Sequence, residues 1–136
     1  MAKSEMRKLT PVLIVDAIEP CLPFWVDRLG FAKTVEVPEG DRLGFVILAK
    51  DKVEVMYQSR ASVEKDVPGV LGSHVTGTAT DSATLFIEVG DIASCERAMK
   101  DVEKVVPRRR TFYGMDEIGV REPGGHVIVF AQPVQG

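Results

Sequence analysis

The chain contains few of the residues that mark metal-rich, disulfide-rich or membrane proteins. Its 136 residues include two cysteines, two histidines and one tryptophan. No run approaches the ~20 apolar residues that a membrane-spanning helix needs, so we expect no membrane association. The charged segment 1–8 has no apolar stretch after it, which argues against a signal peptide. We therefore expect a cytoplasmic protein without a disulfide framework.

An excess of positive charge is also lacking. The formal net charge is -3, and the short basic run 108–110 does not reverse it, so we expect no nucleic-acid partner. An apolar content of 45% and a charged content of 27% are ordinary for a globular protein. A chain of this length forms one domain, residues 1–136, and buries roughly two-thirds of its unfolded surface.

The most informative pattern that is present is a weak internal repeat. Segment 10–21 (TPVLIVDAIEPC) matches segment 84–95 (TLFIEVGDIASC) at an offset of 74 residues, with Thr10 over Thr84. Near the ends of the two halves, the best match has an offset of 75 and places Glu54 over Val129. A duplicated unit places equivalent positions around a shared cavity. The repeat therefore directs attention to Thr10, Glu54, Thr84 and Val129.

Each half of the chain predicts the order strand, helix and three strands. Alternating and β-branched runs predict strands, and apolar residues spaced three and four apart predict helices. In module one, residues 9–58, Asp16 is the expected helix cap and Gly30 the expected helix end. In module two, residues 82–133, Asp91 is the expected cap. The predicted strands cover 9–16, 32–37, 43–49, 53–58, 83–89, 105–111, 116–122 and 126–132.

Residues 59–80 form the predicted linker, which is rich in glycine, serine, threonine and valine. Residues 62–66 are expected to form one helical turn before Pro68. For residues 72–80 two interpretations stay open, a plain connection and a lid over the cavity. The fold class predicted from these elements is α+β: two tandem βαβββ modules forming a curved mixed-sheet cup with helices on the outer face.

Two segments carry a resemblance to a known group. Segment 24–31 (FWVDRLGF) and segment 113–131 (YGMDEIGVREPGGHVIVFA) resemble motifs of the glyoxalase/bleomycin-resistance/extradiol-dioxygenase group, the vicinal oxygen chelate superfamily. The resemblance covers both modules and implies the fold predicted above. It also implies a homodimer, with modules paired within or between chains.

Enzymes of that group hold a divalent metal with side chains of the first and last strand of each module. Carried over to this chain, the four ligand positions are Thr10, Glu54, Thr84 and Val129. Only Glu54 is a strong ligand there, and one carboxylate does not hold a catalytic divalent ion. We therefore expect no metal and no other cofactor, unless the strand register is misassigned. His126 has the wrong strand parity for the cavity and is expected at the surface.

Strand periodicity also predicts the lining of the cavity, a mainly apolar cup with two carboxylates. The candidate ligand-binding residues are Thr10, Val12, Glu54, Met56, Thr84, Phe86, Glu88 and Val129. Burial in such a cup would raise the pKa of Glu54 and make it a candidate proton acceptor. Glu117 is the second candidate catalytic acid, although a solvent-facing carboxylate is the simpler interpretation.

Two functional classes follow. The first is a metal-independent small-molecule-binding protein, similar to the bleomycin-resistance branch, that sequesters a drug or metabolite in the cup. The second is a metal-dependent lyase, isomerase or dioxygenase of the same superfamily with an atypical ligand set. Whether the protein is an enzyme stays open on the sequence.

Overall fold

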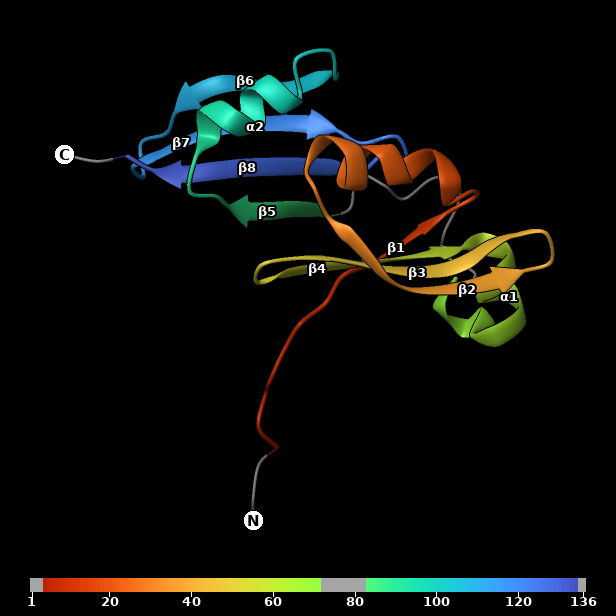
Figure 1. The fold of residues 1–136 in the computed structure, drawn as a ribbon. Helices are drawn as coiled ribbons and strands as arrows, with labels where there is room; N and C mark the ends of the chain where they lie inside the picture. The colour runs from red at the N-terminus through yellow and green to blue at the C-terminus, as the bar shows by residue number, and fades with distance from the viewer. Residues whose placement is uncertain (1–3, 72–82, 135–136) are drawn as a thin grey trace.

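The computed structural model describes residues 4–71 and 83–134, which form two sheets of the same topology. Sheet A has the order β1-β4-β3-β2, and sheet B has the order β5-β8-β7-β6 (Figure 1). In both sheets the first and last strands of the module are parallel neighbours, and the other pairs are antiparallel. The predicted α+β class with two tandem modules is confirmed.

All eight predicted strands are present, with ends that shift by up to three residues. Sheet A consists of β1 (Val12–Val15), β2 (Ala32–Glu39), β3 (Arg42–Lys50) and β4 (Val53–Ser59). Sheet B consists of β5 (Thr84–Glu88), β6 (Lys104–Arg110), β7 (Met115–Arg121) and β8 (Val127–Pro133).

The helical segment of module one is irregular. It consists of a 3-10 helix, η1 (Glu19–Cys21), and a six-residue π-helix, η2 (Pro23–Arg28). Each begins with a proline in its first turn, where no backbone donor is needed. The expected cap is wrong: Ile18 occupies the cap position, and Asp16 instead forms an ion pair with Arg60 at 3.1 Å.

Two further helices have side-chain caps. Helix α2 (Ile92–Ala98) begins at Asp91, whose carboxylate accepts from Ser94 N at 3.2 Å, as predicted. Helix α1 (Arg60–Asp66) is the predicted turn in the linker, and Ser59 caps it by accepting from Ser62 N at 3.1 Å. It lies on the side of sheet A away from sheet B (Figure 1). A short 3-10 helix, η3 (Pro68–Val70), follows it. The proposed lid, 72–80, lies outside the described residues.

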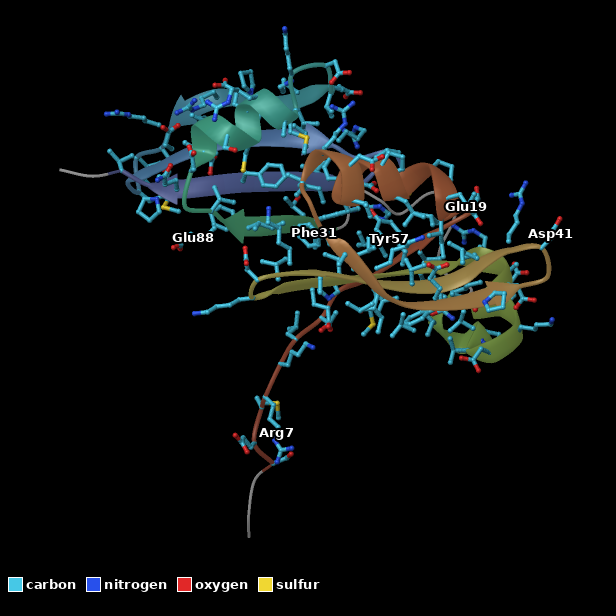
Figure 2. All side chains as sticks on the ribbon, viewed as in Figure 1. Arg7, Glu19, Phe31, Asp41, Tyr57 and Glu88 are labelled. Atoms are coloured by element: carbon cyan, nitrogen blue, oxygen red, sulfur yellow. The ribbon has the colours of Figure 1, made fainter. Side chains whose placement is uncertain are left out.

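One hydrophobic core joins the two modules. Alternate side chains of both sheets point into the layer between them, where the π-helix η2 also packs. Figure 2 shows Phe31 and Tyr57 in this layer. The largest fully buried side chains are Trp25, Tyr57, Phe24, Phe130, Ile18 and Leu48. The opposite face of each sheet, here called the open face, carries the alternate residues and remains partly exposed.

The strand register corrects one equivalence taken from the repeat. In sheet B, Thr84 pairs with Val127, and Phe86 pairs with Val129. In sheet A, Val12 pairs with Met56, which places Thr10 beside Glu54. The position across from Thr84 is therefore Val127, two residues before the predicted Val129. Glu54 and Val127 are therefore equivalent, at an offset of 73 residues, and the match at an offset of 75 misaligned the last strands of the two modules by two residues.

Candidate functional site

Glu54 and Thr10 are in contact, and the environment of the carboxylate is polar. Thr10 Oγ1 donates to Glu54 Oε1 at 3.1 Å, and Lys8 Nζ lies 2.7 Å from the same oxygen. The hydrogen bond from Lys8 lowers the pKa of Glu54 below its ordinary value, and the hydrogen bond from Thr10 and the charge of Lys8 lower it further. Partial burial raises this pKa, but by less. The expectation of a raised pKa is therefore wrong, because the N-terminal segment supplies a cation that the strand pattern does not indicate.

The counterparts of Thr10 and Glu54 in module two are a threonine and a valine. Thr84, Phe86 and Glu88 are exposed along β5, an edge strand, with Phe86 at 54% exposure. Val129 lies on the same open face and is buried at 9% exposure. No ionisable side chain of module two thus stands where Glu54 stands in module one, since Val127 occupies that place.

The donor set does not fit the metal that the fold group implies. The four positions provide two threonines, a valine and one carboxylate that already has a lysine partner. Within residues 4–71 and 83–134, no group of three or more His, Cys, Asp or Glu side chains is arranged to hold a metal ion. A site of three strong ligands is what a catalytic divalent metal needs. No step of a reaction is therefore assigned to a metal here.

A cleft of about 370 Å³, here called the outer cavity, lies between β5, the first residues of β4 and the segment that precedes β1. It contains four of the predicted site residues, Glu54, Thr84, Phe86 and Glu88. Other walls come from Leu9, Pro11, Lys52, Val53, Val55, Leu85 and Ile87. The volume lies within the range of ligand sites.

The remaining predicted residues do not line this cleft. Val12 is 46% exposed on the open face of sheet A, next to Met56. Val129 packs on the open face of sheet B against Gly119, where an added Cβ would lie 3.4 Å from the valine methyl. Thr10 holds Glu54 from beside the cleft. The predicted cup is thus divided, and only its part along β5 forms a cavity.

A second cavity of about 450 Å³, here called the inner cavity, lies on the other side of β5. It is bounded by the β3–β4 turn, the end of β5 and the first turn of α2, with Phe31 and Phe130 from the core layer. Strand periodicity could not indicate this space, because it arises from the docking of one module on the other. Both cavities include Lys52, Val53, Ile87 and Glu88, so they meet along β5.

Glu117 is buried, which corrects the expectation of a solvent-facing carboxylate. Its exposure is 3%. Arg109 donates from Nε and Nη2 to Glu117 Oε1 at 3.0 and 2.8 Å, and Tyr113 OH donates to Oε2 at 2.9 Å. All of its oxygens are occupied by neighbouring side chains of β6 and the following turn. This arrangement is that of a structural ion pair on sheet B, away from both cavities.

A row of buried, hydrogen-bonded polar side chains, here called the polar chain, connects the two modules, and no pattern in the sequence indicated it. Trp25 Nε1 donates to Tyr57 OH at 2.9 Å, and Tyr57 OH donates to Glu122 Oε2. The other oxygen of Glu122 accepts from the backbone of His126 at 2.5 Å and lies 2.9 Å from His126 Nδ1. His126 points away from the open face, as its parity predicts, but it is not at the surface. Its side chain is 12% exposed.

The polar chain controls the ionisation of its members. Burial opposes the charge on Glu122, but the hydrogen bonds from His126 and Tyr57 outweigh it, so the pKa of Glu122 lies below its ordinary value. Burial beside Glu122 raises the pKa of the Cys21 thiol to about 12. In the part of the chain that the structure describes, every buried side-chain nitrogen or oxygen has a hydrogen-bond partner. These hydrogen-bonded side chains therefore join the two modules structurally, and none of them lines either cavity.

The fold just described is that of a known class of proteins. No family model and no curated protein matches this sequence. The structure is similar to a glyoxalase/bleomycin resistance protein/dioxygenase from Nocardioides, with a TM-score of 0.71 and 13% identity over 98% of this chain and 88% of that chain. It is also similar to a glyoxalase/bleomycin resistance protein/dioxygenase family enzyme from Burkholderia phytofirmans PsJN, with a TM-score of 0.72 and 12% identity over 92% and 97%.

A third similar structure is lactoylglutathione lyase from Agrobacterium tumefaciens, with a TM-score of 0.71 and 11% identity over 95% of both chains. Identities this low establish the fold alone. The chain therefore has the vicinal oxygen chelate fold, as the two sequence motifs predicted. Among its described residues no helix is long and apolar enough to cross a membrane.

Proposed function

We propose that this protein binds a small molecule without a metal, in the outer cavity between its modules. The observation that carries the proposal is the composition of the four positions that the fold group uses for metal ligands. Two threonines, a valine and one lysine-paired glutamate stand there, beside a cleft of ligand size. A role in sequestering a drug or metabolite in the cytoplasm is consistent with such a site.

The cleft is suited to an amphipathic ligand. Its walls are mainly apolar, with Phe86 as an exposed aromatic surface and Thr84 as a neutral hydrogen-bonding group. Ligand sites commonly combine apolar walls with a few polar groups that fix orientation. Glu54 is held by Lys8 and Thr10, so it supplies a fixed acceptor and not a free countercharge.

A metal-dependent lyase, isomerase or dioxygenase is the alternative, and it has less support. The names of the similar structures include enzymes, but those names describe other chains. The metal positions of this chain lack the donors that such a reaction needs.

A direct test compares metal and ligand dependence in one preparation. Purified protein is analysed for nickel, zinc, iron and manganese, dialysed against a chelator, and screened by thermal shift with amphipathic aromatic compounds. We expect no stoichiometric metal, and ligand shifts that survive chelation and weaken in Phe86→Ala. A stoichiometric metal whose removal lowers the melting temperature and abolishes ligand shifts would overturn the proposal. The matched control is Phe112→Ala, since Phe112 is a fully exposed phenylalanine outside the cleft.

We further propose that the protein is a homodimer that covers the open face of sheet A. Val12, Val35 and Val37 are each more than 40% exposed on this sheet. Exposed apolar patches of this kind commonly mark interaction surfaces. Sedimentation at micromolar concentration should give twice the monomer mass, and Val37→Lys should give the monomer. A monomeric wild-type protein would contradict this part of the proposal.

A further inference from the structure

We propose that the inner cavity is a second ligand site, which takes a small zwitterion with an aromatic side chain, of the kind found in α-amino acids. This inference goes beyond the proposed function, because the inner cavity lies on the core side of β5 and not on the open face. Three features carry it: the size of the cavity, its apolar walls, and two opposite charges at its junction with the outer cavity.

The inner cavity is large and mainly apolar. It is a cleft open to solvent with a volume of about 450 Å³, which lies within the range of ligand sites. Phe31 and Phe130 supply aromatic surface at its base, and Ile87, Val53 and Leu29 supply aliphatic walls. Figure 2 shows Phe31 between the two sheets, with Glu88 at the outer end of β5. A single aromatic ring fits this lining.

The charges at the junction are Lys52 and Glu88, which line both cavities. Lys52 extends from the β3–β4 turn, and Glu88 is the last residue of β5. Within the described segments, neither side chain comes within 4.0 Å of an opposite charge, including one another. A carboxylate on the ligand would pair with Lys52, and an ammonium group on the ligand would pair with Glu88. A zwitterionic head group satisfies both, and its side chain then points to Phe31 and Phe130.

Two of the other three charged residues around the cavity already have partners. Lys50 Nζ donates to Leu29 O at 2.7 Å, and Asp91 accepts from Ser94 N to begin α2. The third, Asp51, is at the tip of the turn and does not line the outer cavity. Lys52 and Glu88 are therefore the charged pair at the junction of the two cavities.

Four probes with one indole ring separate the contributions. L-tryptophan carries both charges, tryptamine only the ammonium, indole-3-propionate only the carboxylate, and indole neither. L-alanine serves as a zwitterion without the ring. Binding is measured by titration calorimetry and ligand-observed NMR on the full-length protein. We expect L-tryptophan to bind about threefold to fivefold tighter than each singly charged probe, as exposed charge pairs allow, and L-alanine not to bind.

Variants then assign each contact. Lys52→Gln should bring L-tryptophan to the affinity of tryptamine, and Glu88→Gln should bring it to that of indole-3-propionate. Cys95→Phe fills the inner cavity and should abolish binding, whereas Phe86→Ala, which alters only the outer cavity, should leave it unchanged. Equal affinity for all four indole probes, or no binding of any of them, would overturn the inference.

The variants distinguish a failure of the proposed inner site from a failure of the proposed outer site. If Phe86→Ala weakens L-tryptophan and Cys95→Phe does not, the ligand lies in the outer cavity, which contradicts the inner site and supports the proposed function. Should Cys95→Phe fail to fold, Phe86→Ala decides between the cavities: an unchanged affinity for L-tryptophan supports the inner site, and a weakened affinity contradicts it.

Discussion

Replacing Tyr57 with phenylalanine removes one oxygen from the buried polar chain, and its cost can be worked out from the contacts. The change leaves Trp25 Nε1 without an acceptor and takes one hydrogen bond from the Glu122 carboxylate. An unsatisfied buried donor costs about 1–3 kcal/mol, and a hydrogen bond to a charged group contributes about 1.5–3 kcal/mol, so Tyr57→Phe should lose about 2.5–6 kcal/mol of unfolding free energy. For a chain of this length that corresponds to a melting temperature lower by roughly 10–20 °C.

Urea unfolding at pH 7 measures this loss, and Tyr113→Phe is the matched control. Tyr113 also donates to a glutamate, at 2.9 Å, but its side chain is half exposed, so water replaces the lost bond. The control should lose less than about 1 kcal/mol. A double-mutant cycle with Trp25→Phe should show that the two losses are not additive, because the donor and its acceptor are removed together. Similar losses for Tyr57→Phe and Tyr113→Phe, or additive losses in the cycle, would refute the reasoning.

Four other changes test separate parts of the structure. The pKa of Glu122 is lowered in the folded state, so the stability that this carboxylate contributes is present above its ordinary pKa of 4.5 and is lost as the pH falls through the lowered pKa. Glu122→Gln should therefore give a flatter pH dependence of the unfolding free energy below pH 4.5, and an unchanged slope would contradict this. Gly124→Ala should lose about 1–3 kcal/mol, since an added Cβ would meet a valine methyl of β1 at 2.8 Å. Gly69→Ala is the neutral control, since no atom of the described residues lies within 4 Å of its added Cβ; equal effects on thermal unfolding would count against this packing. Glu54→Gln should leave the melting temperature nearly unchanged, because the lysine that pairs with this carboxylate is mostly exposed, and a large drop by calorimetry would show a structural role. Cys21, with a pKa near 12, should react with a thiol reagent at pH 8 only at the rate of unfolding; rapid labelling of the native protein would disagree.

Local patterns predicted most of the fold. The strands of both modules, the cap at Asp91 and the helical turn before Pro68 depend on short-range periodicity and on backbone chemistry, which a sequence carries directly. The wrong prediction of a helix cap at Asp16 shows where local patterns fail. Two prolines divide the first helix into short irregular turns, and the Asp16 carboxylate pairs with an arginine 44 residues away.

The candidate site was predicted less well, for a related reason. Parity placed Glu54, Thr84, Phe86 and Glu88 on the correct face, but it could not show that they form a cleft apart from Val12 and Met56. The partners that determine charge come from remote segments: Lys8 lowers the pKa of Glu54, and Tyr57 reaches Glu122 across the module boundary. The inner cavity depends wholly on how the modules dock, which no local pattern records.

The central claim is that the cleft along β5 binds a small molecule without a metal. The most direct measurement is a two-dimensional NMR titration of isotope-labelled, chelator-treated protein with an amphipathic aromatic ligand found by the thermal-shift screen. We expect chemical-shift changes that are concentrated in residues 52–55 and 84–88 and that have the same size when zinc or nickel is added back. Chemical-shift changes that appear only after zinc or nickel is added would contradict this proposal.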